Sequence, residues 1–191
     1  MKQFSGYAPQ KMQIKETLPV GAYVSVIKDA EEVEIGSYHA LVLLVDIAEG
    51  EQKDFFLRDY KAQDGEDKKW RGRLFVNVPT DDGSEKDALT KRIFNDTIAC
   101  IEDSNPGYHW NWDEKSLKGR RIGHLSREKE WEFNGKTGWR TELCFVKSVD
   151  DIHNGRYKMP QRKPLAKSVS SDISYGSFGE PDPQGDEDLP F

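Results

Sequence analysis

Aromatic and basic side chains are interleaved at two places in the chain, and this mixture suits contact with single-stranded nucleic acid. The first place is Trp70-Arg71-Gly72-Arg73, and the second is a predicted hairpin that carries Trp131, Lys136, Trp139 and Arg140. Bases stack on aromatic rings, and cationic side chains follow the phosphates. The same rings could instead fill a core, and Phe75, Phe133, Leu143 and Phe145 are the aromatic and apolar residues best suited to that. The tryptophans of the two places are the strongest stacking candidates, because their sequence neighbours are polar.

A third group of rings, Tyr108-His109-Trp110-Asn111-Trp112, precedes a basic run that contains Lys115, Lys118, Arg120 and Arg121. Two interpretations stay open for the rings: they clamp a DNA strand, or they pack across an open end of the domain. Under the first, Trp110 stacks on a base while Arg120 and Arg121 contact phosphates. The basic run could also be a solvated strand edge, which Lys and Arg protect against aggregation.

The last six residues, Asp186-Glu187-Asp188-Leu189-Pro190-Phe191, place an acidic run before a small apolar end. A partner with a hydrophobic slot for Phe191 and a cation for a carboxylate could capture this end. The alternative is a solubilising acidic tail, which is the commoner role of a charge run. The terminal Leu-Pro-Phe favours a protein-docking tip.

The net charge of −6 is concentrated at the end of the 191-residue chain. Six of the 34 acidic residues lie in 172–191, where there is no Lys or Arg, so residues 1–171 balance 28 acids against 28 bases. A neutral body is not typical of basic nucleic-acid-binding domains, although a local basic face remains compatible with it. Cys100 and Cys144 have apolar neighbours and no metal-ligand spacing, so both are predicted to be buried thiols.

Nothing in the sequence indicates catalysis. The four histidines, His39, His109, His124 and His153, form no metal-ligand motif, and no phosphate-binding loop or nucleophile motif is present. Glu66-Asp67-Lys68 contains an acidic-x-Lys fragment of the kind found in metal-dependent nucleases, but no apolar strand positions it. We therefore expect a non-enzyme without cofactor or metal. Since no signal peptide or membrane span is evident, we expect it in the cytoplasm of a bacterial host cell.

The order of predicted elements is that of an OB-fold. Strands are expected over 22–28, 38–48 and 70–79, followed by one helix over 84–102, with Ser84 and Asp87 as its capping box. A hairpin about Asn134-Gly135 then joins the β stretches 118–127 and 130–133 to a return strand, 138–149. Three strands, a helix and a hairpin predict a mainly β, five-stranded OB-fold barrel with one helix and a disordered C-terminal tail.

This organisation divides the chain into four parts. We expect an N-terminal arm at 1–17, an OB-fold single-stranded-DNA-binding domain at 18–150, a basic hinge and disordered linker at 151–185, and the docking tip at 186–191. The linker assignment follows from the Ser, Gly, Pro and Asp content after residue 168.

Several segments resemble phage- and prophage-encoded single-stranded-DNA-binding proteins of Gram-positive bacteria. They are Ile101–Tyr108, Lys118–Gly123, Phe133–Thr137 and Ser148–Ile152 with Gly155 and Pro160, while the acidic tip is similar to that of bacterial and phage single-stranded-DNA-binding proteins. The resemblance covers about residues 18–162 and implies a phage-encoded single-stranded-DNA-binding role. It does not carry over a defined set of binding residues.

We therefore expect a protein that covers single-stranded DNA, largely independently of sequence, during phage replication or recombination. Its partners would be single-stranded DNA and replication or recombination proteins that dock on the tip, with no membrane, and homo-oligomer formation is left open. The alternative is an interaction or decoy protein that presents the tip to host replication or repair enzymes and binds little DNA.

Overall fold

The computed structural model describes residue 7 and residues 16–165. The docking tip, the linker from residue 166 onward and most of the N-terminal arm lie outside the described residues.

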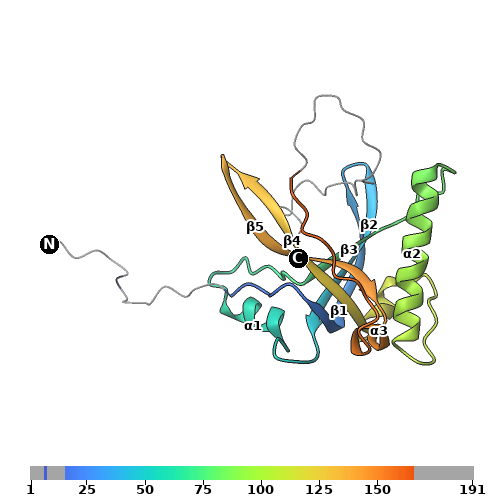
Figure 1. Cartoon of the computed structure of the whole chain (residues 1–191), viewed down its shortest axis with the longest axis horizontal. Coiled ribbons are helices and arrows are strands. Elements are labelled where there is room, and N and C mark those ends of the chain that lie inside the picture. Colours follow the sequence, from blue (N-terminus) through green and yellow to red (C-terminus); the bar gives the residue numbers. More distant parts are fainter. Residues whose placement is uncertain (1–6, 8–15, 166–191) are drawn as a thin grey trace.

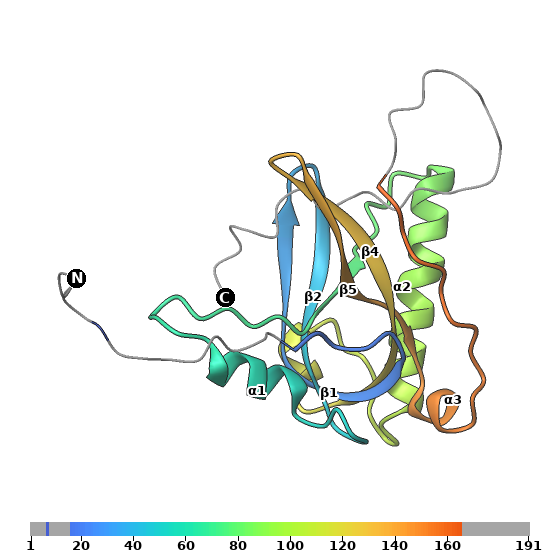
Figure 2. The same ribbon diagram turned by 60° about the vertical axis from the view of Figure 1, so that its left-hand side comes forward.

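The described part of the chain is mainly β, as predicted, and its centre is a five-stranded antiparallel sheet. The strands follow the order β3-β2-β1-β4-β5, and the bounds are Ala22–Ile35 (β1), Tyr38–Ile47 (β2), Arg73–Asn77 (β3), Arg121–Phe133 (β4) and Lys136–Lys147 (β5). The prediction of a single helix is wrong. Residues 16–165 contain three α-helices, α1 (Phe55–Ala62), α2 (Glu85–Asp103) and α3 (Val149–His153), with a 3-10 turn, η1 (Glu114–Leu117). In Figures 1 and 2, α1 and α2 lie on opposite sides of the strands.

The long strand β1 joins the two halves of the sheet. Its first residues, Ala22–Val26, pair with β4, whereas Ser25–Ile35 pair with β2 across a bulge between Ile27 and Asp29. A bulge bends a strand and increases its twist, so the β2–β3 half and the β4–β5 half of the sheet are inclined to each other about β1. This pairing is OB-like. Within residues 16–165 no ladder joins the two edge strands β3 and β5.

One continuous apolar cluster lies between the sheet and the helices. It contains Ile27 from β1, Leu43 from β2, Leu74 from β3 and Ile122 from β4, together with Ile101 from α2. β2 is buried along most of its length, as its apolar run predicts. Cys100 is buried and Cys144 is half-buried, and the two do not form a disulfide with each other, so the prediction of burial holds fully for the first only.

Helix α2 begins as its sequence predicts, but its capping differs in detail. The Ser84 hydroxyl accepts a hydrogen bond from the Asp87 N–H at 3.0 Å. The Asp87 carboxylate does not return to Ser84. It accepts instead from the N–H groups of Thr80 and Asp81 and pairs with Lys91. Phe94, Thr97 and Ile101 form the buried stripe, whereas Ile93 is exposed.

Helix α1 is held by tertiary contacts that a local pattern does not reveal. Its N-terminal residue Asp54 has φ = 58° and makes no side-chain cap. The buried carboxylate of Asp46, at the end of β2, accepts from the N–H groups of Ile47 and Phe56. Burial raises the pKa of Asp46, and these hydrogen bonds oppose that shift. Phe55 and Phe56 then enter the core cluster and fix the helix at the end of the sheet.

Candidate nucleic-acid interface

A groove runs between the two edge strands of the sheet, where β3 and β5 face each other without a ladder. Its volume is about 1030 Å³, and its walls come from β3, β5, α1 and α2 together with Glu16–Leu18 and parts of β4. This is at the upper end of the roughly 300–1,000 Å³ found for small-molecule pockets. The groove is therefore large enough for an extended ligand.

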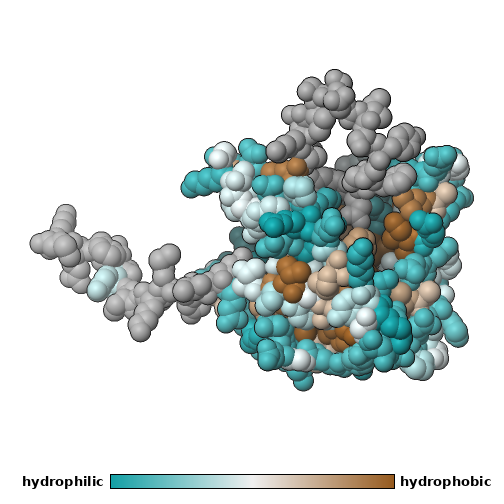
Figure 3. Space-filling model, in the orientation of Figure 1, coloured by the Kyte–Doolittle hydropathy of each residue, from teal (hydrophilic) through white to brown (hydrophobic). Residues whose placement is uncertain are grey.

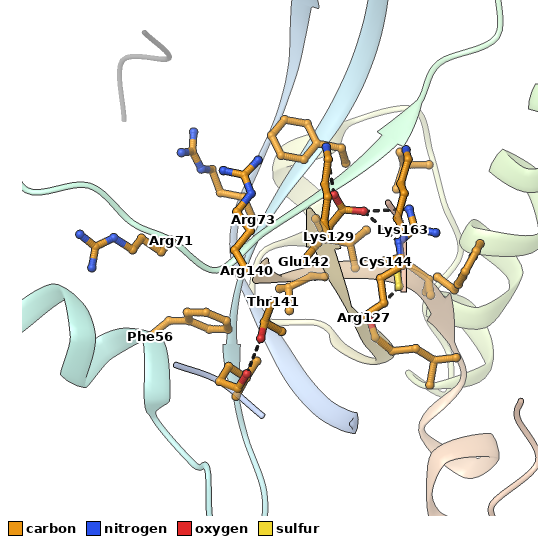
Figure 4. Close-up of a pocket in the computed structure, with 18 of the residues that line it drawn as sticks. Phe56, Arg71, Arg73, Arg127, Lys129, Arg140, Thr141, Glu142, Cys144 and Lys163 are labelled. Carbon is orange, nitrogen blue, oxygen red and sulfur yellow. Dashed lines mark hydrogen bonds and ion pairs between the residues drawn. The ribbon is translucent and has the colours of Figure 1, made fainter. Parts of the chain in front are cut away.

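Four of the predicted DNA-contacting residues line this groove: Arg71, Arg73, Trp139 and Arg140. They come from two places about 65 residues apart in sequence, which the sheet brings together through its two edges. In Figure 4 the three arginines lie on the side of the groove that faces Phe56 of α1. The two aromatic–basic regions singled out from the sequence thus meet at a single site.

The cations at this side of the groove differ in how they are held. Arg71 lies just before β3, and its guanidinium pairs with Asp59 of α1 at 2.7 Å. Arg73 opens β3, is half-buried, and makes no ion pair with any described residue. An anionic ligand could therefore contact Arg73 without first breaking an ion pair within the described part of the chain.

Aromatic rings flank the same groove. Trp139 is 40% exposed, and the Arg162 guanidinium lies 5.2 Å from its ring centroid. Phe145 of β5 also lines the groove and is 45% exposed, and Phe75 of β3 is half-buried there. Phe145 and Phe133 were predicted to fill the core, and both are exposed. The β4–β5 pairing has a bulge between His124 and Leu125, and Phe145 is left without a partner on β4 there. The bulge interrupts the regular alternation of inward and outward side chains along β5 on which the prediction for Phe145 depended.

The remaining predicted residues lie outside the groove. Trp70 directs its indole N–H to the Val45 carbonyl oxygen at 3.0 Å, and its ring contacts that of Tyr60. Trp131 and Lys136 lie on the projecting end of the β4–β5 hairpin. The Trp131 ring there covers Gly138, where a side chain would collide with the indole.

The basic residues after the third aromatic group have partners within the fold. The Arg120 guanidinium lies 4.2 Å from the centroid of the Tyr108 ring. Arg121 pairs with Glu49, which also contacts His153 Nε2 at 2.7 Å. The His153 hydrogen bond, helped by Arg121, lowers the pKa of Glu49, so the pair with Arg121 is fully charged at neutral pH.

The two tryptophans of that group differ in environment. Trp110 packs against the core cluster, and its backbone N–H donates to Glu102. Trp112, with φ = 64°, is 79% exposed and stacks on the Phe94 ring of α2, the planes 12° apart. Apolar surface also gathers on the side of the molecule where α2 lies in Figure 3. Ile93 of α2 is exposed. For Trp110, the structure therefore supports the second interpretation, in which the ring packs against the domain.

Sequence reasoning missed a charged cluster in the same groove, next to Arg140, which is opposite Lys129 in the β4–β5 ladder. It consists of Arg127 and Lys129 of β4, Glu142 of β5, and Lys163 from the segment that follows α3. The β4–β5 register, in which Arg127 faces Glu142, could have indicated this pair once the Asn134-Gly135 turn was fixed.

Within residues 16–165 and Tyr7, no group of three or more His, Cys, Asp or Glu side chains is placed to hold a metal ion. None of the helices in that part of the chain has the length and apolar character that crossing a bilayer requires. Comparison with known proteins found no family model and no curated protein that matches this sequence. The resemblance to phage single-stranded-DNA-binding proteins therefore stays a prediction.

Proposed function

We propose that this protein binds single-stranded DNA in the groove between β3 and β5, with an OB-type barrel as its binding domain. The observation that carries the proposal is the meeting of Arg73, Arg140 and Trp139 at this groove. Cations there would contact phosphates, and the exposed rings of Trp139 and Phe145 would stack on bases. Neither kind of contact reads the edge of a base, so binding would be largely independent of sequence.

The proposed setting is phage DNA replication or recombination in the cytoplasm of a bacterial host. The tip at residues 186–191 would recruit partner enzymes through its acidic run and terminal Phe191. This part of the proposal rests on the sequence and on the resemblance stated above.

A titration of fluorescein-labelled oligo(dT), followed by anisotropy, tests DNA binding directly. We expect saturable binding at low salt that weakens as salt rises, because phosphate contacts release counterions. Arg73→Ala should weaken binding several-fold. Arg92→Ala is the matched control, because Arg92 is exposed on α2 and does not line the groove. Absence of oligo(dT) binding at low salt would refute the proposal.

Two observations favour the second candidate, an interaction or decoy protein that presents the tip to host enzymes. The body has no net charge, and the groove contains Asp59, Asp96 and Glu142 besides its cations. Deletion of residues 186–191 separates the candidates. A DNA-binding protein keeps or gains oligo(dT) affinity when the acidic tip is removed, whereas a decoy loses its capture of replication or repair enzymes and shows no DNA binding in either form.

A further inference from the structure

The charged cluster of Arg127, Lys129 and Glu142 is built around one carboxylate. Arg127 lies opposite Glu142 in the β4–β5 ladder. Both its Nε and its Nη2 donate to Glu142 Oε1, at 3.2 and 2.8 Å. Lys129 Nζ lies 3.1 Å from the other carboxylate oxygen, Oε2. Each oxygen of Glu142 is thus held by a different cation.

These charges are largely removed from water. The side chains of Arg127 and Lys129 are 11% and 10% exposed, and that of Glu142 is 23% exposed. Removing charges from water is costly unless the geometry compensates. Here two cations share a single carboxylate, so this three-residue arrangement carries a net positive charge at the wall of a groove.

Neighbouring contacts fix the cations and add to this charge. The Arg127 guanidinium lies 5.7 Å from the Phe145 ring centroid, next to one of the exposed rings of the groove. Lys163 forms a parallel bridge with Lys129, and its backbone N–H donates to Glu128 while its carbonyl accepts from Glu130. This pairing brings a third cation to the groove lining. Figure 4 shows the Lys163 side chain beside the Arg127–Glu142–Lys129 arrangement.

The two oxygens of the Glu142 carboxylate contact Arg127 and Lys129 separately. The two non-bridging oxygens of a phosphodiester could make the same two contacts. We propose that Arg127 and Lys129 form a phosphate-binding subsite of the groove, and that the Glu142 carboxylate competes with a DNA phosphate for these two cations. The inference rests on the proposed function, and it adds residues and a form of regulation that the sequence did not indicate. A phosphate that enters the subsite must displace Glu142 from one or both cations, which limits affinity at this position.

Glu142→Gln tests the competition. Gln keeps the shape but removes the charge, so we expect oligo(dT) to bind several-fold more tightly, with a salt slope steeper by up to about 0.7, the value for one added phosphate contact on a single strand. Glu128→Gln is the matched control, because Glu128 is an exposed neighbour on β4 that does not line the groove. Inorganic phosphate should also raise the melting temperature of Glu142→Gln more than that of the unaltered protein.

Lys129→Gln covers the case in which Glu142→Gln fails to fold, because it retains the Arg127–Glu142 pair. It should weaken oligo(dT) binding and make the salt slope shallower by about 0.7, whereas Lys28→Gln, an exposed lysine on β1, should change neither. The subsite is refuted if the unaltered protein binds oligo(dT), Lys129→Gln has the same affinity, and the affinity of Glu142→Gln is no higher. The cluster would then be only a structural ion pair. If the unaltered protein binds no oligo(dT), the proposed function and the subsite fall together.

Discussion

Two regions of the molecule combine rings and cations in similar proportion, and the fold uses them in opposite ways. In the segment 108–121, Trp110 packs against the core, Arg120 lies on the Tyr108 ring and Arg121 pairs with Glu49. In the β4–β5 hairpin, Trp139 and Arg140 line an open groove.

The difference shows that composition alone does not identify a nucleic-acid-binding surface. A ring or cation can contact a ligand only where the fold leaves it at an open surface, and Trp139 and Arg140 are at the groove, whereas Trp110, Arg120 and Arg121 are not. In the segment 108–121 Arg120 lies on the ring of Tyr108 from the same segment, and Arg121 pairs with Glu49, which follows β2. On the hairpin, the edge strand β5 presents both Trp139 and Arg140 to the groove.

The largest effect that separates the two regions concerns stability. Trp110→Ala removes a ring that packs against the core, and we expect it to lower the free energy of unfolding by about 3 kcal/mol. Trp112→Ala is the control, because that ring is 79% exposed, and it should cost less than about 1 kcal/mol. Urea unfolding measures both. A Trp110→Ala protein of unaltered stability that has lost oligo(dT) binding would reverse the roles assigned to the two regions.

A change of similar size in the free energy of unfolding is expected from pH, through His124 at the base of the hairpin. His124 is fully buried in β4 and contacts the Ser25 hydroxyl at 2.9 Å, and burial lowers its pKa to about 4. Since the unfolded chain takes up this proton near pH 6.5 and the folded chain only near pH 4, the free energy of unfolding should fall as the pH drops through this window. The loss attributable to His124 is up to about 3 kcal/mol.

Urea unfolding at pH 7.0, 5.5 and 4.5 checks this dependence. His124→Gln should show a shallower decline than the unaltered protein, whereas His39→Gln, at an exposed site, should not. Equal declines in all three proteins would exclude His124 as the source.

A smaller effect is expected on binding by the hairpin. Trp139→Ala should reduce oligo(dT) affinity about tenfold, because stacking contributes roughly 1–3 kcal/mol per base. Trp131→Ala, on the same hairpin but outside the groove, should reduce it less. Anisotropy titrations at a single low salt concentration measure both variants. An equal loss of oligo(dT) affinity in the two variants would indicate that DNA binds at the end of the hairpin and not in the groove.

The parts of the fold that were predictable from sequence have local causes. Asn134-Gly135 forms the hairpin turn because both residues adopt positive φ, at 49° and 73°. Ser84 begins α2 through its own hydroxyl, and the apolar run of β2 is buried on both faces.

What the sequence did not reveal depends on contacts between distant residues. Helix α1 is fixed by the buried carboxylate of Asp46 and not by a cap of its own. The groove combines Arg73 with Trp139, and the pairing of Arg121 with Glu49 spans 72 positions. Only the order of strands in the sheet determines which of these residues meet.

The salt dependence of oligo(dT) binding in two double variants tests the central claim most directly. Arg73→Ala with Arg140→Ala removes two cations of the groove, and Arg120→Ala with Arg121→Ala removes two that lie outside it. We predict that the first pair weakens binding at least tenfold and makes the slope of log affinity against log salt shallower by about 1.4, at about 0.7 per phosphate on a single strand. The second pair should change both by little. The opposite ranking, or equal effects of the two pairs, would contradict the assignment of the groove as the DNA-binding surface.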